Sequence, residues 1–185
     1  MPKIDYTDLT SKQVAMVDFA LSEPGTDFLS VVGAIRSGKG VGAAAGTISG
    51  IHEDCEEHGP GVDHFVAGQT AGSFTANNEE YLRQACERLG YDFRYTTKMG
   101  KPQYDVGNGK ATIYIYGGSN ARSHLAIRGL TAGRGWIDEA TLCHPQFIRD
   151  AVDRLSYDSS KMIFTTNAGL PGSYFKQEWW DSDNP

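Results

Sequence analysis

A glycine-rich stretch near the N-terminus has residue types and spacing suited to binding phosphate. Residues 33–40 read Gly-Ala-Ile-Arg-Ser-Gly-Lys-Gly and match G-x-x-x-x-G-K-[ST] except at Gly40. In such a loop the backbone N–H groups surround phosphate oxygens, the lysine reaches the terminal phosphates, and the Ser or Thr hydroxyl binds Mg²⁺. The sequence therefore predicts a nucleotide site that lacks one metal ligand. The predicted phosphate-binding residues are Gly33, Ala34, Ile35, Arg36, Ser37, Gly38, Lys39 and Gly40.

Two other interpretations of this stretch stay open. Residues 38–43, Gly-Lys-Gly-Val-Gly-Ala, also resemble a dinucleotide-binding turn, although Lys39 would have no purpose in it. Alternatively, the glycines form a turn that binds nothing. The residues on either side favour phosphate binding, because an apolar run ends at Gly33 and a helical pattern follows Gly40.

Adjacent acids follow another apolar run, about a hundred residues after the loop. In phosphoryl-transfer sheets, an Asp in the place of Asp138 holds Mg²⁺, and a Glu in the place of Glu139 polarises the attacking water. Thr166 and Asn167 end the next strand, where a hydroxyl and an amide could sense the terminal phosphate. Two arginines, Arg36 in the loop and Arg128, could neutralise charge that develops on phosphate.

Strands alternating with helices would position these groups. Strands are expected at residues 28–32, 62–67, 136–139 and 161–166, and helices at residues 13–21, 41–51, 75–89 and 145–155. Asn108-Gly109 predicts a hairpin between residues 104–106 and 111–116. This alternation predicts an α/β fold with a mostly parallel central sheet flanked by helices.

Two features of the second predicted helix have structural interpretations. Gly42, Gly46 and Gly50 recur every four residues, which predicts a bare helix face packed closely against the sheet. The acids near its end, residues 53, 54, 56 and 57, are expected to form a solvated face.

Length and composition limit the remaining possibilities. A chain of 185 residues is expected to form one domain, and its net charge of −6 indicates no global basic face for nucleic acid. The odd number of cysteines, three, argues for a reducing compartment. No apolar run is long enough to cross a membrane.

The order of these motifs resembles the ATPase domain of the large terminase subunit, the motor that packages DNA into procapsids of tailed bacteriophages. The Arg-containing loop at 33–39, Trp136-Ile-Asp-Glu-Ala and Phe164-Thr-Thr-Asn, followed by Gly169-Leu-Pro, carry this resemblance. Residues 115–120 and 127–131 are similar to the segment that leads into the acid-bearing strand of that family. The resemblance implies a P-loop NTPase fold of the additional-strand, catalytic-glutamate type. It further implies that residues 1–185 are one ATPase domain, shortened at its C-terminal side and without the family's nuclease domain.

The resemblance also implies roles for single residues. Gln13 would contact adenine, and Lys39 with the loop amides would hold ATP. Asp138 would orient Mg²⁺, and Glu139 would activate water. Thr166 and Asn167 would link hydrolysis to movement. Arg36 would act within its own subunit, whereas Arg128 would reach into a neighbouring one. The implied partners are double-stranded DNA, the portal protein, the small terminase subunit and further copies of this chain in a ring, in the host cytoplasm and without a membrane.

Gly40 keeps other functions open. Without the loop hydroxyl, we expect weakened or absent hydrolysis with nucleotide binding retained. A catalytically impaired P-loop fold could serve as an assembly or DNA-binding module. A P-loop ATPase of helicase type is a further alternative, although the accessory motifs of helicases are not found.

Overall fold

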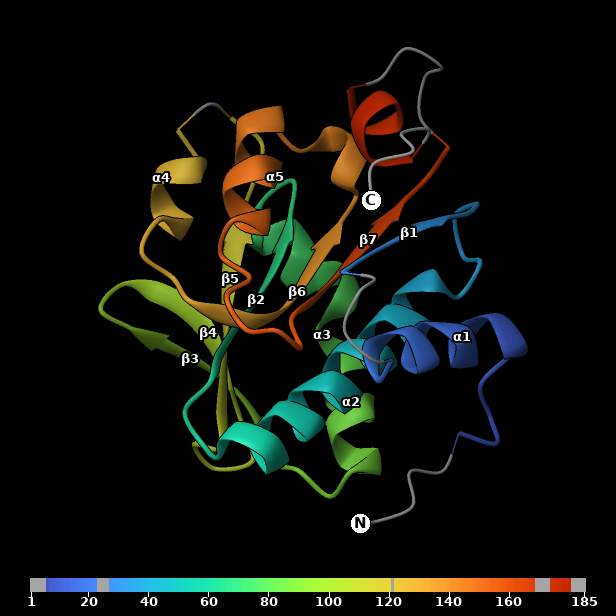
Figure 1. The fold of residues 1–185 in the computed structure, drawn as a ribbon, viewed down its shortest axis with the longest axis vertical. Helices are drawn as coiled ribbons and strands as arrows, with labels where there is room; N and C mark the ends of the chain where they lie inside the picture. The colour runs from blue at the N-terminus through green and yellow to red at the C-terminus, as the bar shows by residue number, and fades with distance from the viewer. Residues whose placement is uncertain (1–5, 23–26, 121, 169–173, 181–185) are drawn as a thin grey trace.

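A single seven-stranded sheet organises the molecule. The computed structural model describes residues 6–22, 27–120, 122–168 and 174–180. Its strands follow the spatial order β1-β7-β6-β2-β5-β4-β3 (Figure 1). The strands are β1 (Phe28–Val32), β2 (Asp63–Gly68), β3 (Phe93–Lys98), β4 (Lys101–Val106), β5 (Ala111–Gly117), β6 (Ala132–Asp138) and β7 (Lys161–Thr166). The helices are α1 (Ser11–Ala20), α2 (Lys39–His58), α3 (Ala71–Arg88), α4 (His124–Ile127) and α5 (Pro145–Val152), with short turns η1 (Ala140–Leu142) and η2 (Lys176–Trp180).

Five strands, β1, β7, β6, β2 and β5, run parallel to one another. β7 is inserted between β1, which leads into the glycine-rich loop, and β6, which ends at Asp138. This inserted strand is the additional strand of the expected fold. The predicted fold class, an α/β fold with an additional strand in a mostly parallel central sheet flanked by helices, is confirmed.

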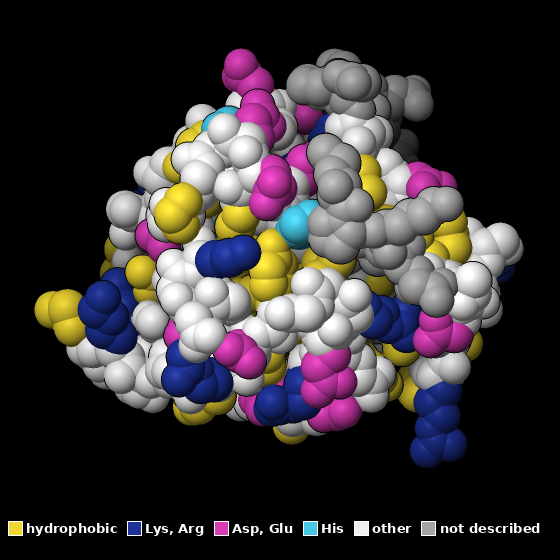
Figure 2. All heavy atoms as spheres, turned by 90° about the horizontal axis from the view of Figure 1, so that it is seen from below, with side chains coloured by type: hydrophobic (Ala, Val, Ile, Leu, Met, Phe, Trp, Pro, Cys, Tyr) yellow, Lys and Arg dark blue, Asp and Glu magenta, His cyan; other side chains and the backbone are white. Residues whose placement is uncertain are grey.

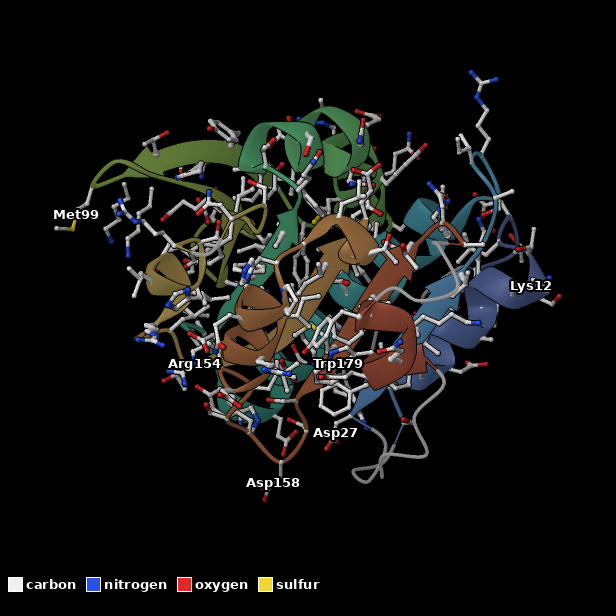
Figure 3. All side chains as sticks on the ribbon, turned by 90° about the horizontal axis from the view of Figure 1, so that it is seen from above. Lys12, Asp27, Met99, Arg154, Asp158 and Trp179 are labelled. Atoms are coloured by element: carbon white, nitrogen blue, oxygen red, sulfur yellow. The ribbon has the colours of Figure 1, made fainter. Side chains whose placement is uncertain are left out.

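The antiparallel end of the sheet contains the predicted hairpin. β4 pairs with β5 in antiparallel register, and the turn between them has Asn108 at φ +55° and Gly109 at φ +88°. Both values lie in the left-handed region that Asn and Gly tolerate best, so the Asn-Gly signal is confirmed. Strand β3 was not predicted, because its side chains are mostly exposed and give no apolar pattern. Met99, at the tip of the β3–β4 hairpin, and Lys12 on α1 lie at opposite sides of the molecule (Figure 3).

Helices cover both faces of the sheet (Figure 1). The sheet therefore separates the core into two layers, one on each face. On the face of α2 and α3, Trp136 is fully buried and contacts Phe74 edge to face, with ring centroids 5.0 Å apart. On the face of α5, Phe147 and Ile137 belong to the second core cluster. The Trp179 ring of η2 packs against the rings of β1 and β7 on that same side. Each face of the sheet therefore has its own apolar layer.

The surface carries both signs of charge. On the face seen in Figure 2, basic and acidic side chains are interspersed, and neither sign forms a continuous patch. Among the described helices, none is long and apolar enough to cross a membrane. Long-range attraction to a polyanion therefore has no basis on this face, and any such contact depends on individual side chains.

Candidate nucleotide-binding site

The glycine-rich loop connects the end of β1 to the start of α2. The Gly33 N–H donates to the Thr166 carbonyl at 3.2 Å, which ties the start of the loop to β7. Gly38 adopts φ +79°, and a Cβ at this position would lie 2.7 Å from Nε2 of Gln13, so the position suits glycine alone. α2 begins at the next residue. Its unpaired N–H groups and the positive end of its dipole therefore lie at the loop, as phosphate binding requires.

Lys39 is held by oxygen atoms on both sides of the loop. Its Nζ donates to the carbonyls of Gly33 at 3.4 Å and Ala34 at 3.3 Å, and to Oδ1 of Asn167 at 2.9 Å. The ammonium thus lies between the loop and the end of β7. These three neutral acceptors are of the kind that phosphate oxygens would replace when a nucleotide binds.

Gln13 reaches the loop from α1. Its Nε2 donates to the Gly38 carbonyl at 2.9 Å, while its Oε1 accepts from the Thr10 N–H at 2.8 Å in a capping box. Both ends of the side chain amide are therefore held, and the residue predicted to contact adenine lies beside the glycine-rich loop.

The three recurring glycines of α2 allow α1 to approach closely. A Cβ at Gly46 would lie 2.8 Å from the Met16 carbonyl oxygen, and one at Gly42 would lie 3.1 Å from Cα of Gln13. A Cβ at Gly50 would lie 2.9 Å from Nε of Arg134. The expectation that this face packs closely against the sheet therefore holds at Gly50, which meets Arg134 of β6, and in part at Gly46, whose Cβ position lies 3.2 Å from Cδ1 of Ile163 of β7. It misses the second partner, α1, which Gly42 and Gly46 meet. Gly42 and Gly46 allow α1 to pack closely on α2, and Gly50 leaves space for Arg134. Because α1 packs there, its residue Gln13 lies beside the loop.

Asp138 ends β6 with both carboxylate oxygens hydrogen-bonded. Oδ1 accepts from the Thr165 hydroxyl at 2.6 Å, and Oδ2 accepts from Nδ2 of Asn78 at 2.8 Å. The Thr165 hydroxyl also accepts from the indole N–H of Trp136 at 2.9 Å. Because an indole only donates and a hydroxyl has one hydrogen, Thr165 must point that hydrogen at Asp138. The acid is thereby fixed through a buried aromatic residue of the core.

Glu139, Thr166 and Asn167 lie on the same edge of the sheet. Glu139 has φ +51° and ψ +42°, a backbone conformation that is uncommon for residues other than glycine and that recurs at functional sites. The Thr166 hydroxyl lies 2.7 Å from that of Thr141 in η1, directly after the acid pair. Asn167 holds Lys39. The structure therefore brings together the loop, the acid pair and the polar residues at the end of β7.

Comparison with solved structures identifies the architecture, whereas no protein-family model and no curated protein matches the sequence. A large terminase from a thermophilic bacteriophage, in complex with ADP, matches with a TM-score of 0.77 at 21% identity. That match covers 94% of this chain and 42% of that protein. The large terminase ATPase domain of Thermus phage P74-26 matches with a TM-score of 0.50 at 16% identity over 85% of this chain and 64% of that one. The N-terminal domain of the DNA packaging ATPase of bacteriophage phi29 matches with a TM-score of 0.54 at 10% identity over 89% of this chain and 82% of that one.

The fold is that of a phage large terminase ATPase domain. The chain spans about two-fifths of the length of the ADP-bound terminase that it matches. In this terminase-type fold the segment Gly169-Leu170-Pro171, part of the sequence resemblance, lies outside the described residues.

The two predicted arginines lie in different parts of this terminase-type fold. Arg36 is exposed within the loop and has φ +63°. Arg128 follows α4, on the opposite face of the sheet from α2, and its Nε donates to Asp150 of α5 at 2.9 Å. Its side chain is 56% exposed and lines an open pocket near the start of β2. Arg36 therefore belongs to the loop site, whereas Arg128 lies apart from it within one chain.

A buried ion pair holds α1, α2 and β6 together at the end of α2 that lies away from the loop. Arg134 is 3% exposed, and its Nη2 donates to Oδ1 of Asp54 at 2.6 Å while Nη1 donates to the Ala20 carbonyl at 2.6 Å. Its backbone N–H donates to Nδ1 of His64 at 3.2 Å. Burial, with a contribution from the Arg134 charge, lowers the pKa of His64 to about 3. The prediction that the acids of this helix form a solvated face is therefore wrong at Asp54, which is 1% exposed. Its charge is neutralised by Arg134, which is far from it in the sequence but in contact with it in the fold.

Sequence reasoning missed three residues that lie at the site, namely Asn78, Thr141 and Tyr81, whose ring carbons lie 3.1 Å from where a Cβ of residue 40 would be. Two of them lie on α3 and one on η1, outside any of the recognised motifs. Their signal was weak: Asn78 and Tyr81 are three residues apart on one face of a helix that was predicted only as amphipathic. Polar residues on an otherwise apolar helix face were the available clue.

The donor set of this edge fits a divalent cation. Asp138 supplies a carboxylate, and Mg²⁺ in nucleotide sites is held by one or two carboxylates together with phosphate oxygens and water. Burial, together with the charges of Asp138 and Glu139, raises the pKa of the nearby Cys143 thiol to about 12. The thiol therefore stays protonated and does not compete as a ligand.

Proposed function

We propose that residues 1–185 form the ATPase domain of a phage terminase large subunit, which couples ATP hydrolysis to the translocation of double-stranded DNA into a procapsid. One observation carries the proposal. The insertion of β7 between β1 and β6 gathers Lys39, Asp138, Glu139 and Asn167 on a single edge of the sheet. Likeness in fold to large terminases, one of them in complex with ADP, supports the same conclusion.

ATP would bind with its phosphates at the start of α2. Lys39 would exchange its bonds to two loop carbonyls and Asn167 for phosphate oxygens, and the loop N–H groups would complete the cradle. Gln13, already beside Gly38, is placed to reach the base. Asp138 would hold Mg²⁺, which would supply positive charge against the charge that develops on the phosphates.

Hydrolysis would then depend on three groups of this chain. Glu139, held at its unusual backbone conformation, would accept a proton from the attacking water. Arg36 would neutralise charge on the transferred phosphoryl group within its own subunit. Asn167 would lose its hydrogen bond from Lys39 when Lys39 binds phosphate. Asn167 and Thr166, at the end of β7, would thereby respond to the presence of the nucleotide.

Arg128 and the partners complete the proposal. Arg128 is exposed and lies apart from the loop, as expected of a residue that acts on a neighbouring subunit in a homo-oligomeric ring. The other proposed partners are double-stranded DNA, the portal protein and the small terminase subunit, in the host cytoplasm.

The test separates binding from turnover. We expect the chain to bind ATP in calorimetry, and Lys39→Ala to abolish that binding while Lys101→Ala, at an exposed lysine of β4, does not. Glu139→Gln is expected to keep binding and to lower phosphate release about 10²–10⁴-fold. Absence of ATP binding by the wild-type chain would refute the proposal.

A second function is favoured by one observation, the glycine at position 40. If the chain binds ATP but releases no phosphate, even with DNA and procapsids present, a catalytically impaired fold that serves assembly is the better conclusion. Turnover stimulated by DNA would exclude this second function.

A further inference from the structure

The space beside Gly40, where a phosphate-binding loop normally places a hydroxyl, is filled by side chains of α3. A Cβ at Gly40 would lie 3.1 Å from both Cδ2 and Cε2 of Tyr81 and 3.2 Å from Oδ1 of Asn78. These separations are shorter than ordinary van der Waals contacts. The loop and α3 therefore approach closely at Gly40, and a larger side chain at this position would collide with α3.

Asn78 presents an oxygen atom to this position. The residue is 3% exposed, and its Nδ2 donates to Oδ2 of Asp138 at 2.8 Å. Because a carboxylate only accepts, the NH₂ group must face Asp138, which leaves Oδ1 directed at Gly40. Among the described residues, no hydrogen bond to this Oδ1 is formed. This Oδ1 is therefore free to accept a further partner beside Asp138 and Gly40.

We propose that Asn78 supplies the neutral oxygen ligand for the divalent cation, in place of the missing loop hydroxyl. A hydroxyl and an amide carbonyl are both uncharged oxygen donors of the kind that Mg²⁺ and Mn²⁺ accept, so the charge of the donor set is unchanged. Asp138 supplies the carboxylate next to it. The inference rests on the proposed nucleotide site and deepens it, because the metal ligand moves from the loop to α3.

The position of Asn78 is set by α3 as a whole. The helix begins with a capping box between Thr70 and Ser73, and Phe74 anchors its first turns against Trp136. Tyr81, one turn after Asn78, covers Gly40 with its ring. This arrangement holds the amide in place without any residue of the loop, as a metal ligand requires.

The first test measures metal binding directly. Mn²⁺ binding to the wild-type chain with ADP is followed by electron paramagnetic resonance, and ADP affinity is measured in Mg²⁺ and in EDTA. We expect Asn78→Leu to weaken Mn²⁺ binding at least tenfold while ADP affinity in EDTA stays within twofold. Unchanged Mn²⁺ binding in Asn78→Leu would overturn the inference.

A control distinguishes a ligand from a residue that only orients the acid. Thr165→Val removes the other hydrogen bond of Asp138 but leaves Asn78 in place. If Asn78 is a ligand, Thr165→Val weakens Mn²⁺ binding much less than Asn78→Leu does. Equal losses in the two variants would reduce Asn78 to a positioning residue and overturn the proposal.

A second variant leaves Asn78 intact, so it does not depend on the folding of Asn78→Leu. Tyr81→Ala removes the ring that a side chain at position 40 would meet, and Gly40→Ser in that background restores the hydroxyl. If Asn78 already fills the ligand position, the added hydroxyl changes Mn²⁺ affinity less than threefold relative to Tyr81→Ala alone. A tenfold gain with Asn78 intact would show an empty position and overturn the inference. Failure of the wild-type chain to bind ADP even in EDTA would instead refute the proposed function.

Discussion

Replacement of Gly46 by Ala tests how α1 is held against α2. The added Cβ would lie 2.8 Å from the Met16 carbonyl oxygen, a backbone atom of α1 that cannot turn aside, and 3.2 Å from Cδ1 of Ile163, a side chain end that can. Overpacking of this kind costs about 1–3 kcal/mol, and the better helix propensity of Ala offsets about 1 kcal/mol of it. We therefore expect a net loss of about 1 kcal/mol, or a fall in Tm of about 2–4 °C for a chain of this size.

The matched control is Gly72→Ala in α3, where the nearest heavy atom to the new Cβ is Oγ1 of Thr70 at 3.9 Å. With space available, this variant should gain a few tenths of a kcal/mol, so the two changes in Tm have opposite signs. Thermal unfolding by circular dichroism measures both. ATP affinity should fall in Gly46→Ala alone, because a displaced α1 moves Gln13 away from Gly38. A Gly46→Ala protein as stable as Gly72→Ala would refute the close approach of the two helices.

Two further predictions concern the buried ion pair and its neighbour. Arg134→Met leaves Asp54 buried without its partner and should lower the free energy of unfolding, measured in urea, by about 3–5 kcal/mol. The double variant Arg134→Met with Asp54→Leu should recover most of that loss, because no charge then stays buried. A double variant as unstable as Arg134→Met would show that the unpaired charge is not the cause. His64 stays uncharged when folded, with a pKa of about 3 against about 6.5 when unfolded, and it faces the charges of Arg134 and Asp54. Only the unfolded chain then takes up its proton as the pH falls below about 6.5, so about 2 kcal/mol of stability should be lost between pH 6.5 and 5, and His64→Gln should flatten that slope. Equal slopes in both proteins would contradict this assignment.

Much of the fold and part of the site could be predicted from local sequence. Strand β7 was predicted with its observed ends, because an apolar run bounded by polar residues is a local signal. The loop was recognisable because phosphate binding requires glycines and a lysine at fixed spacing, and Asp138 was recognisable because it is an acid at the end of an apolar strand. Carboxyl ends of parallel strands meet at one edge, so these motifs were expected to lie together, and the described hydrogen bonds of Lys39 and Asp138 place them there.

The remaining parts depend on contacts between distant segments. Asp54 lies in an acidic run whose composition indicates solvent, and only its meeting with Arg134, eighty residues later, explains its burial. Asn78 was missed for the same reason, because its partners are Gly40 in the loop and Asp138 on another strand. The length of α2 was underestimated, since its polar C-terminal turns gave no apolar signal. Local pattern therefore predicts elements well and cross-element polar pairs poorly.

Strand β6 places Arg134, Trp136 and Asp138 at alternate positions, and all three side chains meet α2, α3 or their partners on one face of the sheet. Because side chains alternate along a strand, these positions share one parity of residue number. Insertion or deletion of one residue between Arg134 and Asp138 would therefore turn at least one of these three side chains toward the face of the sheet that α5 covers. This would hold however well an inserted residue suited a strand. Single substitutions remove these functions one at a time, whereas a change in length separates them. We expect length to be more tightly constrained here than residue identity, in contrast to the β3–β4 hairpin, where exposed Met99 marks a tip that tolerates insertion.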